Sequence, residues 1–154
     1  IIIGRHWERL NHYHQLKHRI KNNPIPPDEV AKYYNGAKIV LNIHRTRNDV
    51  NRNPFNIPAY TPNNRTFDIA ACKSFQLATH RKDVNQYYKE DDEIACVHDI
   101  KEFESKIAFY LKHEGLRTHI AENAYKRTMA DHTYVVRLKE LIGRLQKEVV
   151  RGIA

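Results

Sequence analysis

Residues 37–43 read AKIVLNI, an apolar run of strand length that is bounded by Asn35-Gly36 and by the polar pair His44-Arg45. Continuous runs of this kind are typical of parallel strands that are covered on both faces. We therefore expect residues 37–43 to form a central strand of a parallel sheet.

Further strands and helices alternate around this run. We expect strands at residues 1–4, 74–79 and 94–97, and helices at residues 28–36 and 63–72. The order is strand, helix, strand, helix, strand, strand, and then three helices. This order indicates an α/β fold, a single Rossmann-like lobe with a mostly parallel sheet and C-terminal helices.

The last third of the chain is predicted to be helical. Asp99, with Glu102 three positions on, predicts a capping box. Gly115 is expected to separate the helix behind it from a second one, and Thr133 to start a third. By their 3.6-residue spacing, the expected apolar faces are Ile100, Phe103, Ile107, Tyr110 and Leu111; then Leu116, Ile120, Ala121 and Ala124; then Leu138, Leu141, Ile142, Leu145 and Val149.

The composition leaves several kinds of partner open. The chain has 154 residues, enough for one domain, and a net charge of +8, which favours an anionic partner. Nucleic acid, an anionic membrane surface and a nucleotide diphosphate all qualify. The basic residues are spread along the chain, without an aromatic stacking platform or a reading helix, and this disfavours nucleic acid. No apolar run approaches the length of a transmembrane helix, so we expect no transmembrane segment.

Histidine and cysteine spacing predicts no metal site. Cys72 and Cys96 lie in apolar contexts, which favours buried, reduced thiols over a disulfide or metal ligands. His12, His14 and His18 could share a helical face, but no carboxylate or cysteine completes a ligand set at familiar spacing. We interpret them as a solvated face.

Two short stretches are candidates for binding phosphate. His44-Arg45 comes just past the carboxyl end of the strand at 37–43, where α/β sheets bind ligands. We favour a phosphate contact over the alternative that His44 caps the strand and Arg45 faces solvent. Asn64-Arg65-Thr66-Phe67-Asp68 opens a helix, whose N-terminus attracts phosphate. Asp68 could accept hydrogen bonds from ribose hydroxyls; ordinary N-capping, with Asp68 in the first turn, explains the pattern equally well.

These stretches resemble a known family. Residues 37–45, residues 64–72 (NRTFDIAAC) and Phe75-Gln76-Leu77 are similar to the C-terminal region of CgeB-type spore-maturation proteins, which belong to the "glycosyl transferases group 1" set. The opening Gly4-Arg5-x-Trp7 and the tail, Ala124-Tyr125 with His132-Thr133-Tyr134, extend the resemblance over nearly the whole chain.

The resemblance implies a GT-B glycosyltransferase of a Bacillus-type bacterium. Residues 1–154 would be its partial C-terminal lobe, lacking the first strand and the N-terminal lobe, and inactive alone. This lobe would bind a UDP- or GDP-linked sugar without a metal or other cofactor, for transfer to a glycan or protein of the spore surface or cell envelope. The protein would lie in the cytoplasm, in the mother cell or at the spore coat. The substrate-binding residues implied are Asp68, Arg65, Asn64, Thr66, His44, Arg45, Gly4 and Arg5.

Three positions depart from the family pattern. Asp68 stands where the family has a ribose-binding glutamate, and Lys73 stands where it usually has glycine. Tyr60 occupies the position of a second glutamate in the wider superfamily. These departures favour an alternative function, a non-catalytic structural or interaction domain of a spore coat. No catalytic residue is assigned.

Overall fold

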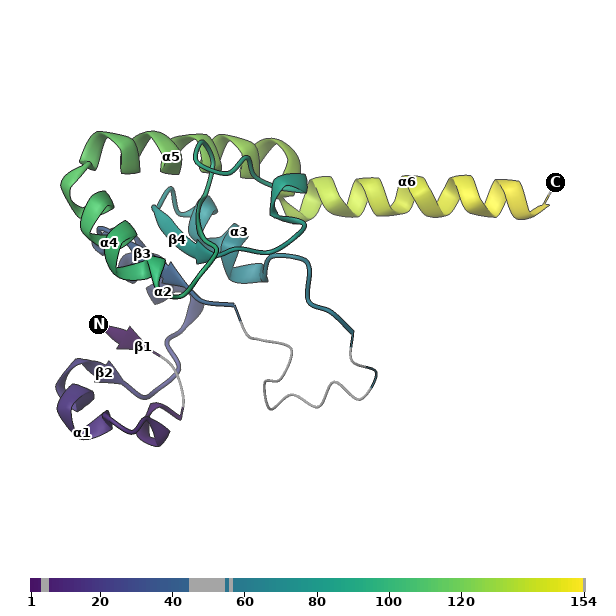
Figure 1. Cartoon of the computed structure of the whole chain (residues 1–154). Coiled ribbons are helices and arrows are strands. Elements are labelled where there is room, and N and C mark those ends of the chain that lie inside the picture. Colours follow the sequence, from purple (N-terminus) through teal and green to yellow (C-terminus); the bar gives the residue numbers. More distant parts are fainter. Residues whose placement is uncertain (4–5, 45–54, 56, 154) are drawn as a thin grey trace. The chain divides into compact units, whose positions relative to one another are not determined.

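The computed structural model of the protein describes residues 1–3, 6–44, 55 and 57–153 (Figure 1). The chain divides into two compact units, Ile1–Gly36 and Ala37–Ala154. Each unit has its own small parallel sheet, so we describe the units separately.

The first unit is built on two short parallel strands. β1 (Ile2–Ile3) pairs with β2 (Ile20–Lys21). Between them lie α1 (Tyr13–Leu16) and two 3₁₀ helices (Trp7–Arg9 and Lys17–Arg19), and α2 (Pro27–Gly36) follows. The strand expected at residues 1–4 is confirmed at Ile2–Ile3, with Gly4 outside the described residues, and the helix expected at 28–36 is confirmed. β2 was not predicted. The side chains of the three N-terminal histidines are exposed, as predicted: His12, His14 and His18.

The second unit contains three parallel strands in the order β3-β4-β5, within the part of the chain that is described. They are β3 (Val40–Asn42), β4 (Gln76–Thr79) and β5 (Ala95–Val97). The α/β fold with a parallel sheet is confirmed. The central position predicted for residues 37–43 is wrong, because β4 lies between the other two strands. The apolar run overstated the burial of β3: Leu41 is 44% exposed and Ile43 is 54% exposed.

Helices cover both faces of β4 and β5. α3 (Asn64–Ala71) follows β3, while α4 (Glu102–Lys112) and α5 (Glu114–Arg127) follow β5. Alternate residues of a strand point to opposite faces, and the core is accordingly divided into two apolar clusters. One cluster contains Ala70, Ala78, Val84, Tyr88, Ile94, Cys96 and Ala124; the other contains Phe75, Leu77, Ala95, Val97, Tyr110, Ile120 and Ala121.

Free thiols were expected at both cysteines, and the structure has them. Cys96 is buried in the first cluster, and burial raises the pKa of its thiol to about 12. Cys72 is only half-buried, because it stands at the C-terminal end of α3.

A buried amide joins β3, α3 and β4. The side chain of Asn42 donates to Thr66 Oγ1 (3.0 Å) and to Gln76 Oε1 (3.1 Å), and it accepts from Asn63 Nδ2 (3.0 Å). Gln76 in turn donates to the carbonyl oxygen of Thr66 (2.9 Å). Asn42, Thr66 and Gln76 are all buried, so these bonds replace hydration that the groups lose on folding.

The starts of the C-terminal helices differ from the predictions. Asp99 Oδ1 accepts from the backbone N–H of Lys101 (3.0 Å), and α4 begins at Glu102. The Glu102 carboxylate accepts from the N–H of His98 (3.3 Å) rather than closing a capping box on Asp99. Two residues of the expected apolar face are at the surface: Ile100, which precedes α4, is 76% exposed and Leu111 is 48% exposed.

The break between α4 and α5 falls at His113, and Gly115 lies inside α5. The predicted glycine break is wrong because a buried side chain terminates α4. The Arg117 guanidinium donates to the carbonyl oxygens of Tyr110 and Leu111, which are among the C-terminal carbonyls that lack a partner within the helix.

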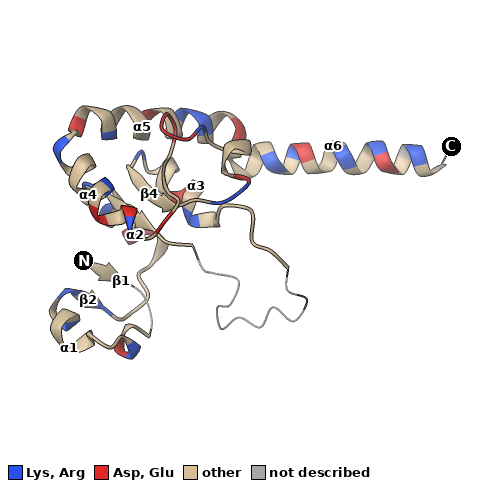
Figure 2. Ribbon diagram, viewed as in Figure 1, with Lys and Arg blue, Asp and Glu red and all other residues tan. Residues whose placement is uncertain are grey.

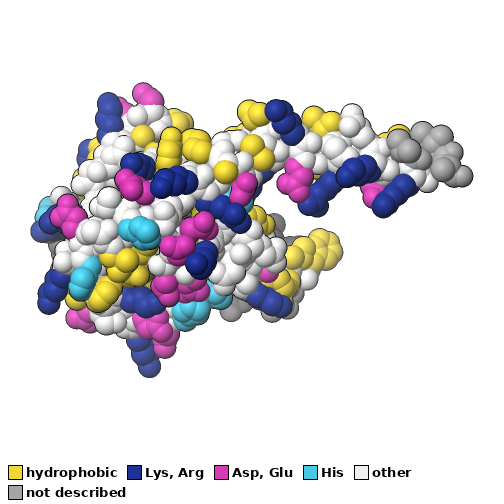
Figure 3. Space-filling model, turned by 90° about the horizontal axis from the view of Figure 1, so that it is seen from above, with side chains coloured by type: hydrophobic (Ala, Val, Ile, Leu, Met, Phe, Trp, Pro, Cys, Tyr) yellow, Lys and Arg dark blue, Asp and Glu magenta, His cyan; other side chains and the backbone are white. Residues whose placement is uncertain are grey.

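A five-residue π-helical segment, Thr128–His132, leads from α5 into α6 (Tyr134–Ile153). The hydroxyl of Thr133 accepts from the N–H of Val136 (3.3 Å), so the predicted start at Thr133 is confirmed as an N-cap. The apolar face predicted for α6 is present but exposed, as yellow side chains along this helix show in Figure 3; its members are Leu138, Leu141, Ile142, Leu145 and Val149. None of the described helices is long and apolar enough to cross a membrane.

Charge is distributed over the helices of the second unit. Lys and Arg alternate with Asp and Glu along α5 and α6 (Figure 2). On α6, for example, Arg144 pairs with Glu140 at 2.5 Å. The net positive charge of the chain is therefore not gathered into one basic helix among those described.

Lys73 ends α3 in a conformation that favours glycine. Its φ is 55°, and its N–H donates to the carbonyl oxygen of Ala70 (2.9 Å) while that of Ser74 donates to Ile69 (3.2 Å). This pair of bonds is a Schellman motif with Lys73 at the position usually held by glycine. The left-handed turn is therefore formed with lysine at this position, and Lys73 Nζ lies 3.0 Å from Glu122 Oε1.

Two substitutions of Lys73 should distinguish the cost of its left-handed backbone conformation from the contribution of its ion pair to stability. Lys73→Ala and Lys73→Gly both remove the contact with Glu122, but only glycine relieves the left-handed strain. We expect the glycine variant to exceed the alanine variant in free energy of unfolding by about 1 kcal/mol, measured by urea denaturation. Equal stabilities would mean that this turn imposes no strain.

Removing the side-chain amide of Asn42 should lower the free energy of unfolding by a large amount for a single substitution. Asn42→Leu leaves Asn63, Thr66 and Gln76 each short of a partner, and we expect a loss of roughly 2–4 kcal/mol in the free energy of unfolding. Leu41→Ala, at the neighbouring half-exposed position of β3, is the control and should cost less. Thermal or urea unfolding of the two variants measures both losses. A smaller loss of stability in Asn42→Leu than in Leu41→Ala would show that the amide network adds little stability.

Candidate functional site

The three strands of the second unit end at one edge, which we call the carboxyl edge. Because the strands are parallel, the residues that follow them lie at the same side of the sheet. A histidine follows each strand: His44 comes two residues after β3, His80 one residue after β4, and His98 one residue after β5.

The N-terminus of α3 is fixed by Asn63. The side-chain oxygen of Asn63 accepts from the N–H of Thr66 (3.1 Å), and its amide donates to Asn42 at the end of β3. Asn63 is therefore the N-cap, and Asp68 lies beyond the first turn of α3. The first-turn placement of Asp68, weighed from the sequence, is wrong.

His44 is held against the end of β4. Its backbone N–H donates to Thr79 Oγ1 (2.9 Å), and its ring Nδ1 lies 2.9 Å from the same oxygen. The Thr79 hydroxyl accepts from the backbone and can give its own proton to Nδ1, an assignment that follows from the hydrogen-bond pattern. The remaining ring proton is then on Nε2, where it can be donated to a ligand.

The Nε2 atom of His44 is buried and has no hydrogen-bond partner among the described residues. The residue as a whole is only 7% exposed. A buried polar atom without a partner costs free energy, and such atoms are often found where a ligand completes the contacts.

Burial and two arginines keep the His44 imidazole neutral. Burial is the largest cause, and the charges of Arg81 and Arg65 add to it, lowering the pKa of His44 to about 4. These arginines come from different elements: Arg65 is the second residue of α3, and Arg81 follows β4. A neutral N–H donor with two cations acting on it favours an anion at this part of the carboxyl edge.

Asp68 lies on the same helix as Arg65. Partial burial raises the pKa of the Asp68 carboxyl, and the charge of Arg65 partly offsets that shift. Arg65 therefore acts electrostatically on both His44 and Asp68. The structure thus places three of the predicted residues, His44, Arg65 and Asp68, close enough for the charge of Arg65 to act on the other two.

The other predicted residues are placed differently. Thr66 is fully buried, and its hydroxyl accepts from Asn42 of β3, so its role in the structure is to hold α3 against β3. Asn64 is the exposed first residue of α3. Gly4, Arg5 and Arg45 lie outside the described residues.

Sequence reasoning missed Arg81 and the neighbouring histidine. Arg81 stands two residues past β4 and His80 one residue past it. The pair His80-Arg81 repeats the His44-Arg45 pattern after the adjacent strand. This repetition at two strand ends was the available signal. Arg81 also donates to the carbonyl oxygen of Ala59 (2.8 Å), which ties the segment before α3 to the end of β4.

The chain matches a family profile and a known protein, but no solved structure. The profile of the glycosyl transferase-like family matches residues 1–143. The chain is 35% identical over 137 residues to the "Spore protein CgeB" of Bacillus subtilis (strain 168), an alignment that covers 86% of this chain and 42% of that protein. The chain thus spans less than half the length of this relative. No solved structure matches.

The low pKa of His44 has a consequence for stability. Unfolding returns this pKa from about 4 to its ordinary 6.5, so between these values the unfolded chain binds the extra proton. The stability contributed by the neutral ring is present above pH 6.5 and is lost as the pH falls toward 4, by up to roughly 3 kcal/mol.

A matched variant isolates this contribution. Urea unfolding at pH 7 and pH 4.5 should show a larger loss of stability in the wild type than in His44→Gln, because the variant lacks the titrating ring while the other groups remain. A loss of the same size in both proteins would show that His44 titrates normally in the folded state.

Proposed function

Because this chain belongs to the glycosyl transferase-like family, we propose that its carboxyl edge binds the diphosphate of a nucleotide-sugar donor. The observation that carries the proposal is the buried, unpartnered Nε2 of His44 among the described residues, with the charges of Arg65 and Arg81 acting on the same ring. The chain would then be the donor-binding lobe of a glycosyltransferase.

The protonation state of His44 supports a phosphate ligand. A neutral imidazole with its proton on Nε2 donates one directed hydrogen bond without carrying a charge of its own. The arginines supply the positive charge, and their planar guanidinium groups match the geometry of phosphate oxygens. In transfer chemistry, the same groups would stabilise the negative charge that develops on the departing nucleoside diphosphate.

Asp68 is our candidate for the ribose contact. Carboxylate oxygens accept the hydrogen bonds that ribose hydroxyls donate, and Asp68 is only partly buried, so its carboxylate remains reachable by a ligand. Its neighbour Arg65, three residues earlier on α3, would place phosphate and ribose contacts on one helix. The N-cap Asn63 and the Asn42 network keep that helix end in position.

The acceptor and the transfer step belong to a larger protein in this proposal. The relative named a spore protein is more than twice as long as the region that aligns with this chain. We propose transfer to a glycan or protein of the spore surface or cell envelope, by a full-length protein that supplies the acceptor site. A non-catalytic coat domain is the rival function, which Tyr60 in place of a glutamate favours.

Titration calorimetry with UDP, GDP and their sugar conjugates tests the donor site. We expect the chain to bind one of the diphosphates, and Arg65→Ala or Asp68→Ala to weaken that binding by about 1.5–3 kcal/mol, or tenfold or more, as for a lost hydrogen bond to a charged group. Arg144→Ala is the matched control, because Arg144 is an exposed arginine on α6; its affinity should equal that of the wild type.

The rival function predicts a different outcome. A coat domain without a donor site would bind neither diphosphate more tightly than the bare nucleoside. Failure of folded wild-type protein to discriminate between nucleoside and nucleoside diphosphate would therefore overturn the donor-site proposal.

A further inference from the structure

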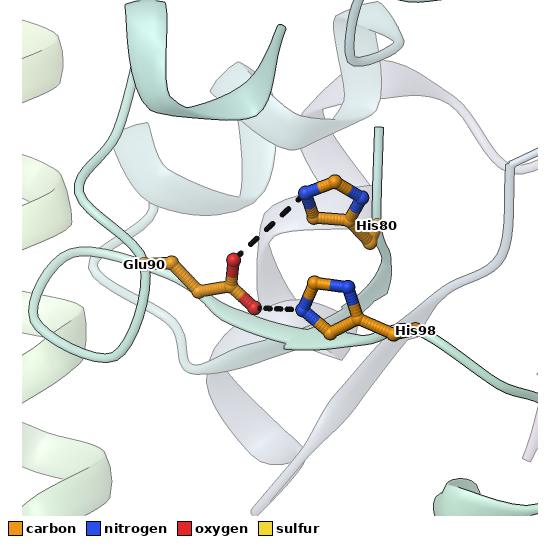
Figure 4. Close-up of side chains that lie close together, drawn as sticks. All are labelled: His80, Glu90 and His98. Atoms are coloured by element: carbon orange, nitrogen blue, oxygen red, sulfur yellow. Dashed lines mark hydrogen bonds and ion pairs between the residues drawn. The ribbon is translucent and has the colours of Figure 1, made fainter. Parts of the chain in front are cut away.

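Two histidines and a glutamate meet at the carboxyl edge, on the strands beyond His44. His80 follows β4, His98 follows β5, and Glu90 lies in the turn segment between these strands. One donor atom from each lies within 4.8 Å of the others. Figure 4 shows each imidazole directing a nitrogen at a different oxygen of the Glu90 carboxylate.

The distances within the cluster are short. His98 Nε2 lies 2.7 Å from Glu90 Oε1, and His80 Nε2 lies 3.9 Å from Glu90 Oε2. The two rings are stacked, with centroids 4.2 Å apart and planes 23° from parallel. Both Nε2 atoms therefore face the same small volume beside the carboxylate.

The backbone around each of the three residues is held by hydrogen bonds. The N–H of His80 donates to the carbonyl oxygen of Val97 (2.8 Å), a contact that ties the ends of β4 and β5 together. The N–H of His98 donates to the Glu102 carboxylate (3.3 Å), and that of Glu90 donates to Asn85 Oδ1 (3.2 Å). The cluster is thus built on fixed backbone rather than on a meeting of free surface side chains.

The donor set suits a borderline transition metal. Two imidazole nitrogens and one carboxylate oxygen are ligands that zinc accepts, with bonds of about 2.0–2.2 Å. A tetrahedral site with such bonds has ligands about 3.3 Å apart. The two contacts with Glu90 bracket this value. No two of the three donor atoms are more than 4.8 Å apart, so a side-chain rotation would have to shorten a separation by roughly 1.5 Å at most. His98 is exposed and free to make that adjustment.

Local charge also favours a cation. Residues 89–99 contain five carboxylates and one lysine, in a chain whose net charge is +8. The carboxylates other than Glu90 raise the negative potential of the segment that carries two of the three ligands. The third ligand, His80, lies outside this acidic segment and directly precedes Arg81.

We propose that His80, Glu90 and His98 form a binding site for a single divalent transition-metal ion, with zinc as the ion of choice. Three protein ligands leave a fourth coordination position for water or for an oxygen of a ligand at the carboxyl edge. The competing explanation is a metal-free cluster in which Glu90 accepts a hydrogen bond from His98 and lies 3.9 Å from His80. The inference stands on these contacts alone and does not depend on nucleotide-sugar binding.

Direct titration of metal-free protein with Zn²⁺ and Co²⁺ tests the site without any nucleotide. We expect one equivalent of Zn²⁺ to bind by calorimetry. Bound Co²⁺ should give the intense visible absorption of four- or five-coordinate cobalt, which Zn²⁺ then abolishes by displacement. His80→Gln, Glu90→Gln and His98→Gln should each weaken binding at least tenfold. His113→Gln is the matched control, since His113 is an exposed histidine that packs on Phe109.

Opposite outcomes would overturn the proposal. If the three ligand variants bind metal as tightly as the wild type and the His113→Gln control, the metal is bound by other histidines of the chain. Absence of binding by wild-type protein whose circular dichroism shows it to be folded would leave the metal-free cluster, with its hydrogen bond between His98 and Glu90. Should a variant fail to fold, the wild-type Co²⁺ spectrum decides instead, because the weak absorption of six-coordinate cobalt would exclude the site. A failed nucleotide titration would leave all of these results unaffected.

Discussion

The side-chain amide of Asn42 is the constraint on which the second unit depends. It lies at the end of β3 and bonds to β4, to α3 and to the N-cap of that helix. A buried amide satisfied at this many points specifies one register and one helix position, because any slip leaves polar groups unpaired. The candidate phosphate site at the carboxyl edge follows from that position: His44 comes two residues later, and Arg65 stands on the helix end that Asn63 caps.

Local sequence signals predicted most of the elements but not their burial. The apolar run at 37–43 contains the strand Val40–Asn42, yet its continuity suggested a covered central strand where the structure has Leu41 half-exposed. Periodicity likewise located α6 correctly while leaving its apolar face open. The burial of a helix or strand face depends on which other element packs against it, and the sequence of one element alone does not reveal its neighbour. The break at His113 was missed for a related reason, since the buried Arg117 that terminates α4 acts from the next helix.

The candidate site could be predicted where the relevant residues follow one strand. His44 was found from its place after the run at 37–43, and the structure adds its buried Nε2 and its low pKa. Arg81 was not found, because its proximity to His44 results from the pairing of β3 with β4. The trio of His80, Glu90 and His98 was not found, because it results from the pairing of β4 with β5. Ligand spacing along the sequence recognises metal sites within a loop or a helix, whereas this cluster is assembled by strand order.

The open apolar face of α6 changes how the chain should respond to temperature. Side chains such as Leu138, Ile142 and Leu145 are already in contact with water in the folded state, so unfolding this helix exposes little new apolar surface. The heat-capacity change of unfolding arises mainly from such newly exposed surface, at an average of about 12–15 cal/mol/K per residue. The heat-capacity change of unfolding this chain should be below that average per residue. Its free energy of unfolding should therefore vary with temperature less than is usual for a protein of this length. Isolated helices are marginal in water, so α6 should also unwind before the sheet that precedes it.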